Sequence, residues 1–315
     1  MQTPDEKPHT PLTGIALKLA SVAVFMTMSA LIKAISGRVP PGEVVFFRSA
    51  FAVPVILVWL IATGNLRSGL ATQNYLGHFW RGLAGTTAMG FGFAGLGLLP
   101  LPEVTAIGYA APLMTVIFAA MFLGEQVRVF RILSVALGLA GVLIILSPRL
   151  SAISAGGVGA TEALGAMVVL ISATFAALAQ VFVRRLVAEE TTTAIVFFFS
   201  VNAALLSLLT APFGWHQPGP GTAAILILSG LLGGVGQVLL TSSYRFADAS
   251  VVAPFEYASM ILSLAIGYFA FAEVPTRVVL GGAALVVLAG ILIIWREHQL
   301  GLERARQTQS MSPQG

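Results

Sequence analysis

Apolar residues occur in long runs along nearly the whole chain, and short polar or Gly- and Pro-containing breaks separate these runs. A helix of roughly 20 apolar residues spans the hydrocarbon core of a bilayer, so each run is long enough to cross a membrane. The breaks at Gly, Pro and charge clusters predict ten helices. The predicted ranges are 12–35, 43–63, 77–98, 103–123, 130–147, 163–186, 193–213, 222–243, 249–272 and 278–295.

Composition agrees with this pattern. The chain is 57% hydrophobic and 10% charged, whereas about a quarter of the residues are charged in an ordinary soluble domain. The connections between the predicted helices are short and leave no room for an extramembrane domain. The sequence therefore predicts an all-α polytopic membrane protein. The absence of cysteine excludes disulfides, thiol chemistry and cysteine-ligated metals.

The positive charges indicate orientation rather than a nucleic-acid partner, because they lie scattered at the ends of apolar segments and form no basic run. With a cytoplasmic N-terminus, twelve Lys and Arg residues, Arg81 among them, fall on the inner side and four on the outer side. This bias predicts that both termini are cytoplasmic. We expect a multi-pass protein of the cytoplasmic (inner) membrane of a bacterium. Arg48 is the one cation that the loops do not explain.

The two halves of the chain resemble each other when the sequence is shifted against itself by 151 residues in one part and 148 in another. These shifts match Lys33 with Arg184, Ser21 with Ser172, Gly14 with Gly165, Gly82 and Gly85 with Gly230 and Gly233, Tyr109 with Tyr257, and Glu125 with Glu273. Each half holds five helices. Because five is odd, the second copy must enter the membrane from the opposite face, which predicts two inverted five-helix repeats.

Several longer stretches resemble a known family. They are "PPGEVVFFRSAF" (40–51), "PLPEVTAIGYAAPLMTVIFAAMFLGEQV" (100–127), "AGVLIIL" (140–146), "ADASVVAPFEYASMILSLAIGYFAFAEVP" (247–275) and "AGILII" (289–294). The chain is similar over 14–296 to the drug/metabolite transporter superfamily, in its ten-helix branch built from two EamA domains. The second half departs by placing Phe199 where the first has Arg48, so that arginine is not duplicated.

The resemblance implies a domain order and a mechanism. A cytoplasmic segment (1–11) precedes the first EamA repeat (12–148), and a linker (149–161), the second repeat (162–296) and a polar cytoplasmic tail (297–315) follow. Helices one, three, four, six, eight and nine are expected to line a midplane cavity with alternating access. Superfamily substrates include amino acids and their derivatives, S-adenosylmethionine, riboflavin and nucleotide-linked sugars. An aromatic-rich lining with a lone acid favours a flat or zwitterionic ligand.

Arg48 has two readings. A charge at membrane depth is costly unless it pairs, reaches the interface or faces water. It either braces a helix end by bonding Glu43 or loop carbonyls, or holds an anion or a gate at the mouth of a cavity.

Glu256 is the most informative carboxylate, because it lies within the ninth predicted helix beside the break expected at Pro254. Ser259 and Ser263 follow at i+3 and i+7, so the three residues share one face. In the first half the matching positions are Gly108, Ala111 and Thr115, so this polarity is not part of the repeat. Glu256 is a candidate for substrate contact and proton coupling, or else a buried structural acid.

Other candidates follow from helical faces and repeat positions. Lys18, Ser21 and Ser29 share a face of the first helix, as do Ser172 and Gln180 on the sixth. Lys18 alternatively reaches the cytoplasmic interface. The remaining candidates for the cavity are Tyr109 and Tyr257, which otherwise serve helix packing. Pro112 and Pro254 are expected to kink their helices, and Glu125 and Glu273 to anchor loops.

A membrane enzyme and a channel are the two alternative functions for a chain of this composition. No catalytic, nucleotide-binding or metal-binding motif is present, and the four histidines lie far apart. A channel would need a repeated selectivity ring, whereas the polar residues are few and asymmetric. We therefore expect a secondary transporter without cofactor or metal. Its expected partners are a small-molecule substrate, the lipid bilayer and a coupling proton, together with a second copy of the chain through helices five and ten.

Overall fold

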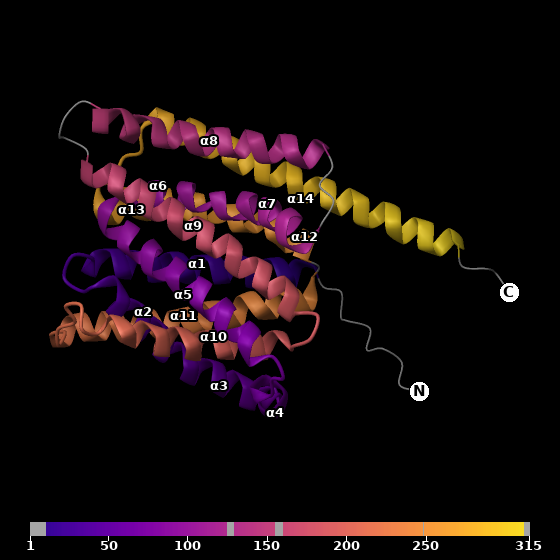
Figure 1. The fold of residues 1–315 in the computed structure, drawn as a ribbon, viewed down its shortest axis with the longest axis horizontal. Coiled ribbons are helices and arrows are strands. Elements are labelled where there is room, and N and C mark those ends of the chain that lie inside the picture. Colours follow the sequence, from indigo (N-terminus) through magenta and orange to yellow (C-terminus); the bar gives the residue numbers. More distant parts are fainter. Residues whose placement is uncertain (1–10, 125–128, 155–159, 248, 312–315) are drawn as a thin grey trace.

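The computed structural model describes residues 11–124, 129–154, 160–247 and 249–311. Ten long helical segments run roughly side by side along the horizontal direction of Figure 1, joined by short connections. The all-helical prediction is confirmed for these residues. The N-terminal segment up to residue 10, Glu125, residues 155–159 of the expected linker and the last four residues of the tail lie outside the described residues.

Each predicted helix has a counterpart, and except for the C-terminal ends of two helices its bounds lie within a few residues of those expected. In the first half the helices are α1 (Pro11–Ile35), α2 (Pro41–Ala50), α3 (Ala52–Ala62), the short α4 (Leu66–Leu70), α5 (Tyr75–Leu98), α6 (Leu101–Gly108), α7 (Ala110–Leu123) and α8 (Val129–Ser154). In the second half they are α9 (Ala160–Leu186), α10 (Thr192–Ser207), the 3-10 turn η1 (Leu208–Thr210), α11 (Pro220–Phe246), α12 (Ala249–Val252), the 3-10 turn η2 (Ala253–Tyr257), α13 (Ala258–Phe271) and α14 (Arg277–Met311).

Proline interrupts three of the predicted spans, near Pro112 and Pro254, where kinks were expected, and near Pro54, where none was. The second span breaks at Phe51 and the fourth at Tyr109, in each case three residues before a proline, Pro54 or Pro112. A proline has no N–H for the carbonyl four residues earlier and its ring crowds that carbonyl, so the helix bends there. In the ninth span, Pro254 lies in the 3-10 turn η2, directly beside Glu256. The irregular backbone thus coincides with the candidate residues Tyr109 and Glu256.

Two helices run past their expected ends. α8 continues to Ser154, into the segment predicted as a linker, and α14 continues to Met311, through most of the polar tail. The tail sequence is rich in Glu, Gln, Leu, Arg and Ala, which are good helix formers, and Pro313 is its first proline. In Figure 1, α14 projects beyond the other helices on the side where α1 begins.

Most of these helices are suited to a bilayer. Eight spans of the described residues are long and apolar enough to cross a membrane, and α8 contributes a shorter apolar stretch, Ile132–Pro148. Large apolar side chains also remain exposed on the outside of the bundle, for example Ile261 and Phe269. Such a surface is costly in water and favourable in lipid. The chain is therefore a multi-pass membrane protein.

Glycines allow the helices to approach each other closely. A Cβ atom at Gly230 of α11 would lie 2.6 Å from the carbonyl oxygen of Phe47 on α2. Between α8 and α14, a Cβ at Gly141 would lie 2.7 Å from the carbonyl oxygen of Gly282, and the reverse distance is also 2.7 Å. These contacts involve backbone atoms, which cannot move aside as a flexible side chain can. The glycine faces of α8 and α14, which suggested a dimer, pack against each other within one chain.

The Gly230 contact gives a test of the packing. We expect Gly230→Ala to lower the melting temperature of the detergent-purified protein, because overpacking a tight contact costs about 1–3 kcal/mol. Gly281→Ala is the matched control, since nothing lies within 4 Å of a Cβ there. An equal melting temperature for the two variants would contradict this packing.

Candidate functional site

A cavity of about 380 Å³ lies between helices of both halves, within the usual range of ligand pockets. Its walls come from α1, α5, α6, α9 and the η2–α13 segment, but α11, the eighth predicted span, contributes none of the lining residues. The lining includes five of the residues singled out from the sequence, Ser29, Tyr109, Ser172, Glu256 and Ser259. The wall also contains residues that the sequence did not single out, among them Met26, Met89, Phe93 and Thr105.

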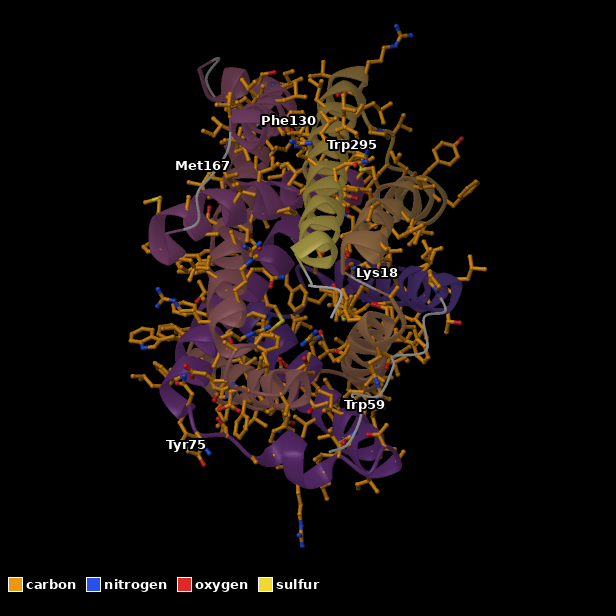
Figure 2. All side chains as sticks on the ribbon, turned by 90° about the vertical axis from the view of Figure 1, so that its right-hand side faces the viewer. Lys18, Trp59, Tyr75, Phe130, Met167 and Trp295 are labelled. Carbon is orange, nitrogen blue, oxygen red and sulfur yellow. The ribbon has the colours of Figure 1, made fainter. Side chains whose placement is uncertain are left out.

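Lys18 and Glu256 form an ion pair at this cavity. The Lys18 side chain is only 5% exposed, whereas the Glu256 side chain is 50% exposed. Lys18 lies toward the middle of the bundle in Figure 2, unlike Tyr75 and Met167 at its periphery. One sequence interpretation is wrong here, because Lys18 is buried against Glu256 and does not extend to the interface. The pairing was not predictable from spacing, since 238 residues separate the partners.

A chain of two hydroxyl groups ends on the backbone carbonyl of Glu256, the acid of this ion pair. Ser259 Oγ donates to the carbonyl oxygen of Glu256 at 2.6 Å and lies 2.6 Å from the Tyr109 hydroxyl oxygen. Because the single Ser259 proton is used on the carbonyl, the Tyr109 hydroxyl is the donor in the second bond. The Tyr257 ring packs edge-on against Tyr109, with 5.0 Å between ring centroids. This network fixes Glu256 in the irregular η2 segment.

Five of the cavity candidates are not among the lining residues, Lys18 and four others. Ser21 donates to the Gly236 carbonyl at 2.9 Å and Ser263 to the Met260 carbonyl at 2.9 Å. Gln180 is exposed on the outside of α9. Tyr257 packs between helices, where a Cβ at Gly290 would collide with its hydroxyl group. A shared helical face was therefore too coarse a signal for these residues.

The end of α1 carries a second ion pair. Lys33 Nζ lies 2.8 Å from Glu273 Oε1, and both side chains are mostly buried. Lys33 also donates to the carbonyls of Leu96 and Leu99, and Glu273 Oε2 accepts the Leu101 N–H at 2.8 Å. Glu273 thus anchors a loop as expected, although it is not exposed. The contacts tie together the ends of α1, α5 and α13 and the start of α6.

Arg48 does not brace Glu43. No ion pair between them occurs within the part of the chain that the structure describes, and the Arg48 Nε atom is buried without a hydrogen-bond partner. The guanidinium carbon of Arg48 instead lies 5.9 Å from the ring centroid of Phe199 on α10. The interpretation of Arg48 as a brace of its own helix end is therefore wrong, because its neighbours are side chains on other helices.

Arg81 was missed as an interior residue, because its place near a predicted helix end looked like an orientation charge. Its guanidinium carbon lies 3.4 Å from the ring centroid of Phe199. Its Nε and Nη1 atoms are buried and have no hydrogen-bond partner. The signal available in the sequence was the mismatch between Arg48 and Phe199 at equivalent repeat positions.

The connection between α9 and α10 is fixed to the segment before α5. Glu190 accepts hydrogen bonds from the Thr72 hydroxyl at 2.7 Å and from the N–H groups of Gln73 and Asn74 at 2.9 and 3.1 Å. Burial of this loop carboxyl raises its pKa. The three hydrogen bonds and nearby His78 lower the pKa by more than burial raises it, so the pKa of Glu190 is below its ordinary value. Glu190 is consequently ionised at neutral pH.

These features define a class of protein, a multi-pass helical membrane protein with a ligand-sized cavity that contains a buried ion pair. The EamA-like transporter family model matches residues 12–147 and 163–295. The chain belongs to the EamA-like transporter family. The resemblance inferred from the sequence is therefore confirmed, as is the expectation of a transporter.

Similar proteins of known name are also transporters. The pseudopaline exporter CntI of Pseudomonas aeruginosa is 29% identical, over 89% of this chain and 95% of the relative. The S-adenosylmethionine uptake transporter of Rickettsia felis is 28% identical, over 95% of this chain and 98% of the relative. The family and these relatives point to transport rather than catalysis. A solved crystal structure with 21% identity superposes with a TM-score of 0.62 over 90% of this chain and 97% of its own, which supports the fold.

Proposed function

We propose that this protein is a secondary transporter that moves a small zwitterionic metabolite across the cytoplasmic membrane of a bacterium by alternating access. The observation that carries the proposal is the Lys18–Glu256 ion pair at the cavity. Glu256 is half exposed, so a ligand can reach it, whereas Lys18 is buried behind it. Charged side chains at membrane depth mark substrate and ion pathways because they are too costly to keep otherwise.

A zwitterion suits this pair because it carries both charges. Its ammonium group can replace Lys18 as the partner of Glu256, and its carboxylate can then pair with Lys18. Neither charge would be left unpaired in the low-dielectric interior, which limits the free energy needed to open the pair. The named relatives handle pseudopaline and S-adenosylmethionine, which supports a metabolite of related chemistry. Protonation of Glu256 would also release Lys18, so proton coupling fits the same site.

Alternating access is often built on two similar halves in opposite orientations, and matched contacts support this arrangement. Ser21 of α1 donates to the Gly236 carbonyl of α11, and Ser172 of α9 donates to the Ala88 carbonyl of α5 at 2.7 Å. Both donors and acceptors occupy equivalent repeat positions. Gly14 at the start of α1 packs on Ala247, and Gly165 near the start of α9 packs on Leu98 and Leu99.

The same contacts support opposite entry of the two halves. The end of α1 lies beside the end of α5, because a Cβ at Gly97 would lie 3.2 Å from Ser36. The start of α9 also lies at that end of α5, through Gly165. α1 and α9 therefore begin at opposite ends of the bundle. With the positive-inside bias, we infer that both termini are cytoplasmic.

Cysteine labelling can test this orientation, because the natural chain contains no cysteine. Arg38 and Gln73 are both exposed and lie in successive connections. We expect a membrane-impermeant thiol reagent to label Arg38→Cys in intact cells and Gln73→Cys only after permeabilisation. Labelling of both positions from the same side would contradict the inferred topology.

The Lys33–Glu273 pair supports a latch on the outer side. Its repeat partners are Arg184 and Glu125, at the opposite face under the inferred topology, where Glu125 lies outside the described residues. Equivalent charge positions at the two faces suit a transporter that closes one side at a time. We infer that Lys33 and Glu273 hold the outer side closed in the state described.

The latch can be tested by removing one charge. Glu273→Gln keeps an acceptor for the Leu101 N–H but removes the ion pair. We expect a Cys at Ser29 in the cavity to react about tenfold faster from outside in this background, since a hydrogen bond to a charged group contributes roughly 1.5 kcal/mol. Glu189→Gln on an exposed connection is the control. An unchanged reaction rate would exclude the latch.

The central prediction concerns Glu256. We expect Glu256→Gln to insert and fold normally but to reduce substrate flux in vesicles at least about tenfold, because a neutral amide cannot pair with the substrate ammonium group. A thermal-shift screen of zwitterionic metabolites identifies the substrate first, since a bound ligand stabilises the native state. Glu189→Gln should transport normally. Wild-type flux with unchanged pH dependence in Glu256→Gln would refute the proposed site.

A further inference from the structure

Phe199 of α10 lies against two arginines from different helices. The guanidinium carbons of Arg81 and Arg48 lie 3.4 and 5.9 Å from its ring centroid. Two glycines make room for this cluster, because a Cβ at Gly85 would lie 2.7 Å from the Phe199 ring and one at Gly233 would lie 3.1 Å from Arg48 Nε. We call Arg48, Arg81 and Phe199 the arginine cluster. It is built from α2, α5 and α10 together, with α11 against it.

The cluster presents buried donors without partners. Arg48 is 6% exposed, and its Nε atom, together with the Nε and Nη1 atoms of Arg81, forms no hydrogen bond. The hydroxyls of Ser49 and Thr86, on the same two helices, are also buried and unpartnered. A buried polar group without a hydrogen bond costs free energy, and a buried charge costs more. Donors left in this way are suited to an acceptor that binds from outside the chain.

The charge of the cluster is also uncompensated. Among the described residues, neither arginine lies within 4 Å of an acidic side chain, unlike Lys18 and Lys33. Phe199 supplies only the weaker attraction between a cation and a ring face. Two like charges held at one ring repel each other, so the site favours a negatively charged group.

The cluster lies next to the cavity but is not part of its lining. On α5, Arg81, Gly85 and Ala88 follow at i, i+4 and i+7 and therefore share one face. Ala88 lines the cavity, and the Phe199 ring covers Gly85 between Ala88 and Arg81. The cluster therefore lies within about two turns of α5 from the cavity wall.

The arginine cluster depends on a difference between the two repeats. Phe199 occupies the position equivalent to Arg48, and Gly85 is equivalent to Gly233. An arginine at 199 would have placed a third cation beside two others. The aromatic ring instead holds both guanidinium groups and leaves their edges, with the N–H donors, for a ligand.

We propose that Arg48 and Arg81 form an anion-binding site for a carboxylate or phosphate group. The planar guanidinium matches the oxygen pairs of both groups and can donate two parallel hydrogen bonds to either. The anion is a free ion, an anionic part of a transported molecule or a lipid headgroup, and all three present the same oxygen acceptors. The site goes beyond the transport proposal, which uses Lys18 and Glu256.

The test measures the melting temperature of the full chain in a neutral detergent. Sodium phosphate, sodium acetate and sodium chloride are compared at equal ionic strength, and phosphatidylglycerol is compared with phosphatidylcholine. We expect phosphate, acetate or phosphatidylglycerol to raise the melting temperature above its matched control, and the effective member identifies the source of the anion. Arg48→Met and Arg81→Met should lose this rise, while Arg67→Met, on the exposed α4, should retain it.

A second readout separates anion binding from a structural role. In chloride, Arg81→Met should melt at or above the wild-type temperature, because it replaces an unpaired buried charge by an apolar chain. A structural brace predicts a clear decrease instead, and that result would overturn the proposal. Arg81→Lys is a third variant, which keeps the charge without the planar fork and should weaken anion affinity about tenfold.

Two further outcomes would overturn the anion site. One is the same wild-type melting temperature with every anion and lipid, and the other is a full anion effect in both arginine variants. These experiments detect anion binding through the melting temperature and do not measure transport. Failure here would consequently leave the Glu256 proposal intact, and failure of Glu256 would leave this site intact.

Discussion

The cost of an unpaired charge in a low-dielectric interior constrains this structure more than any other interaction. Lys18 avoids that cost by pairing with Glu256 at the cavity wall, and Lys33 avoids it through Glu273 and two carbonyls. For Arg48 and Arg81, only the attraction to the face of the Phe199 ring offsets this cost, and it does so in part. The charged positions therefore mark the places where the protein can exchange an internal partner for a ligand or another conformation.

These charges are placed on a scaffold that is closely packed and nearly symmetric. Equivalent serines bond equivalent carbonyls in α1–α11 and α5–α9, and glycines let backbone meet backbone. Against that background, Glu256 opposite Gly108 and Phe199 in place of a second arginine stand out. Packing needs the same shape twice, whereas ligand chemistry needs a particular group once. The departures from symmetry are accordingly where the two proposed sites lie.

Irregular backbone gives the cavity its polar wall. The break at Tyr109 and the 3-10 turn at Glu256 are at equivalent places in the two halves. Non-helical backbone at membrane depth is tolerated only inside protein or beside a water-filled space. Here it directs Tyr109 and Ser259 into one hydrogen-bonded chain that holds Glu256. This support holds the Glu256 backbone in place and leaves the carboxylate free to change its partner.

The sequence alone determined the ten helices, the family and the breaks near Pro112 and Pro254, because these depend on local composition and on the length needed to cross a bilayer. It also found Glu256, since a single acid breaks an otherwise apolar pattern. Only the tertiary structure decided the partners. Lys18 meets Glu256 across 238 residues, and Arg48 turns from Glu43, five residues away, toward Phe199 on another helix. A side chain's partner depends on how helices pack in three dimensions, and helical periodicity specifies a face without naming what lies opposite.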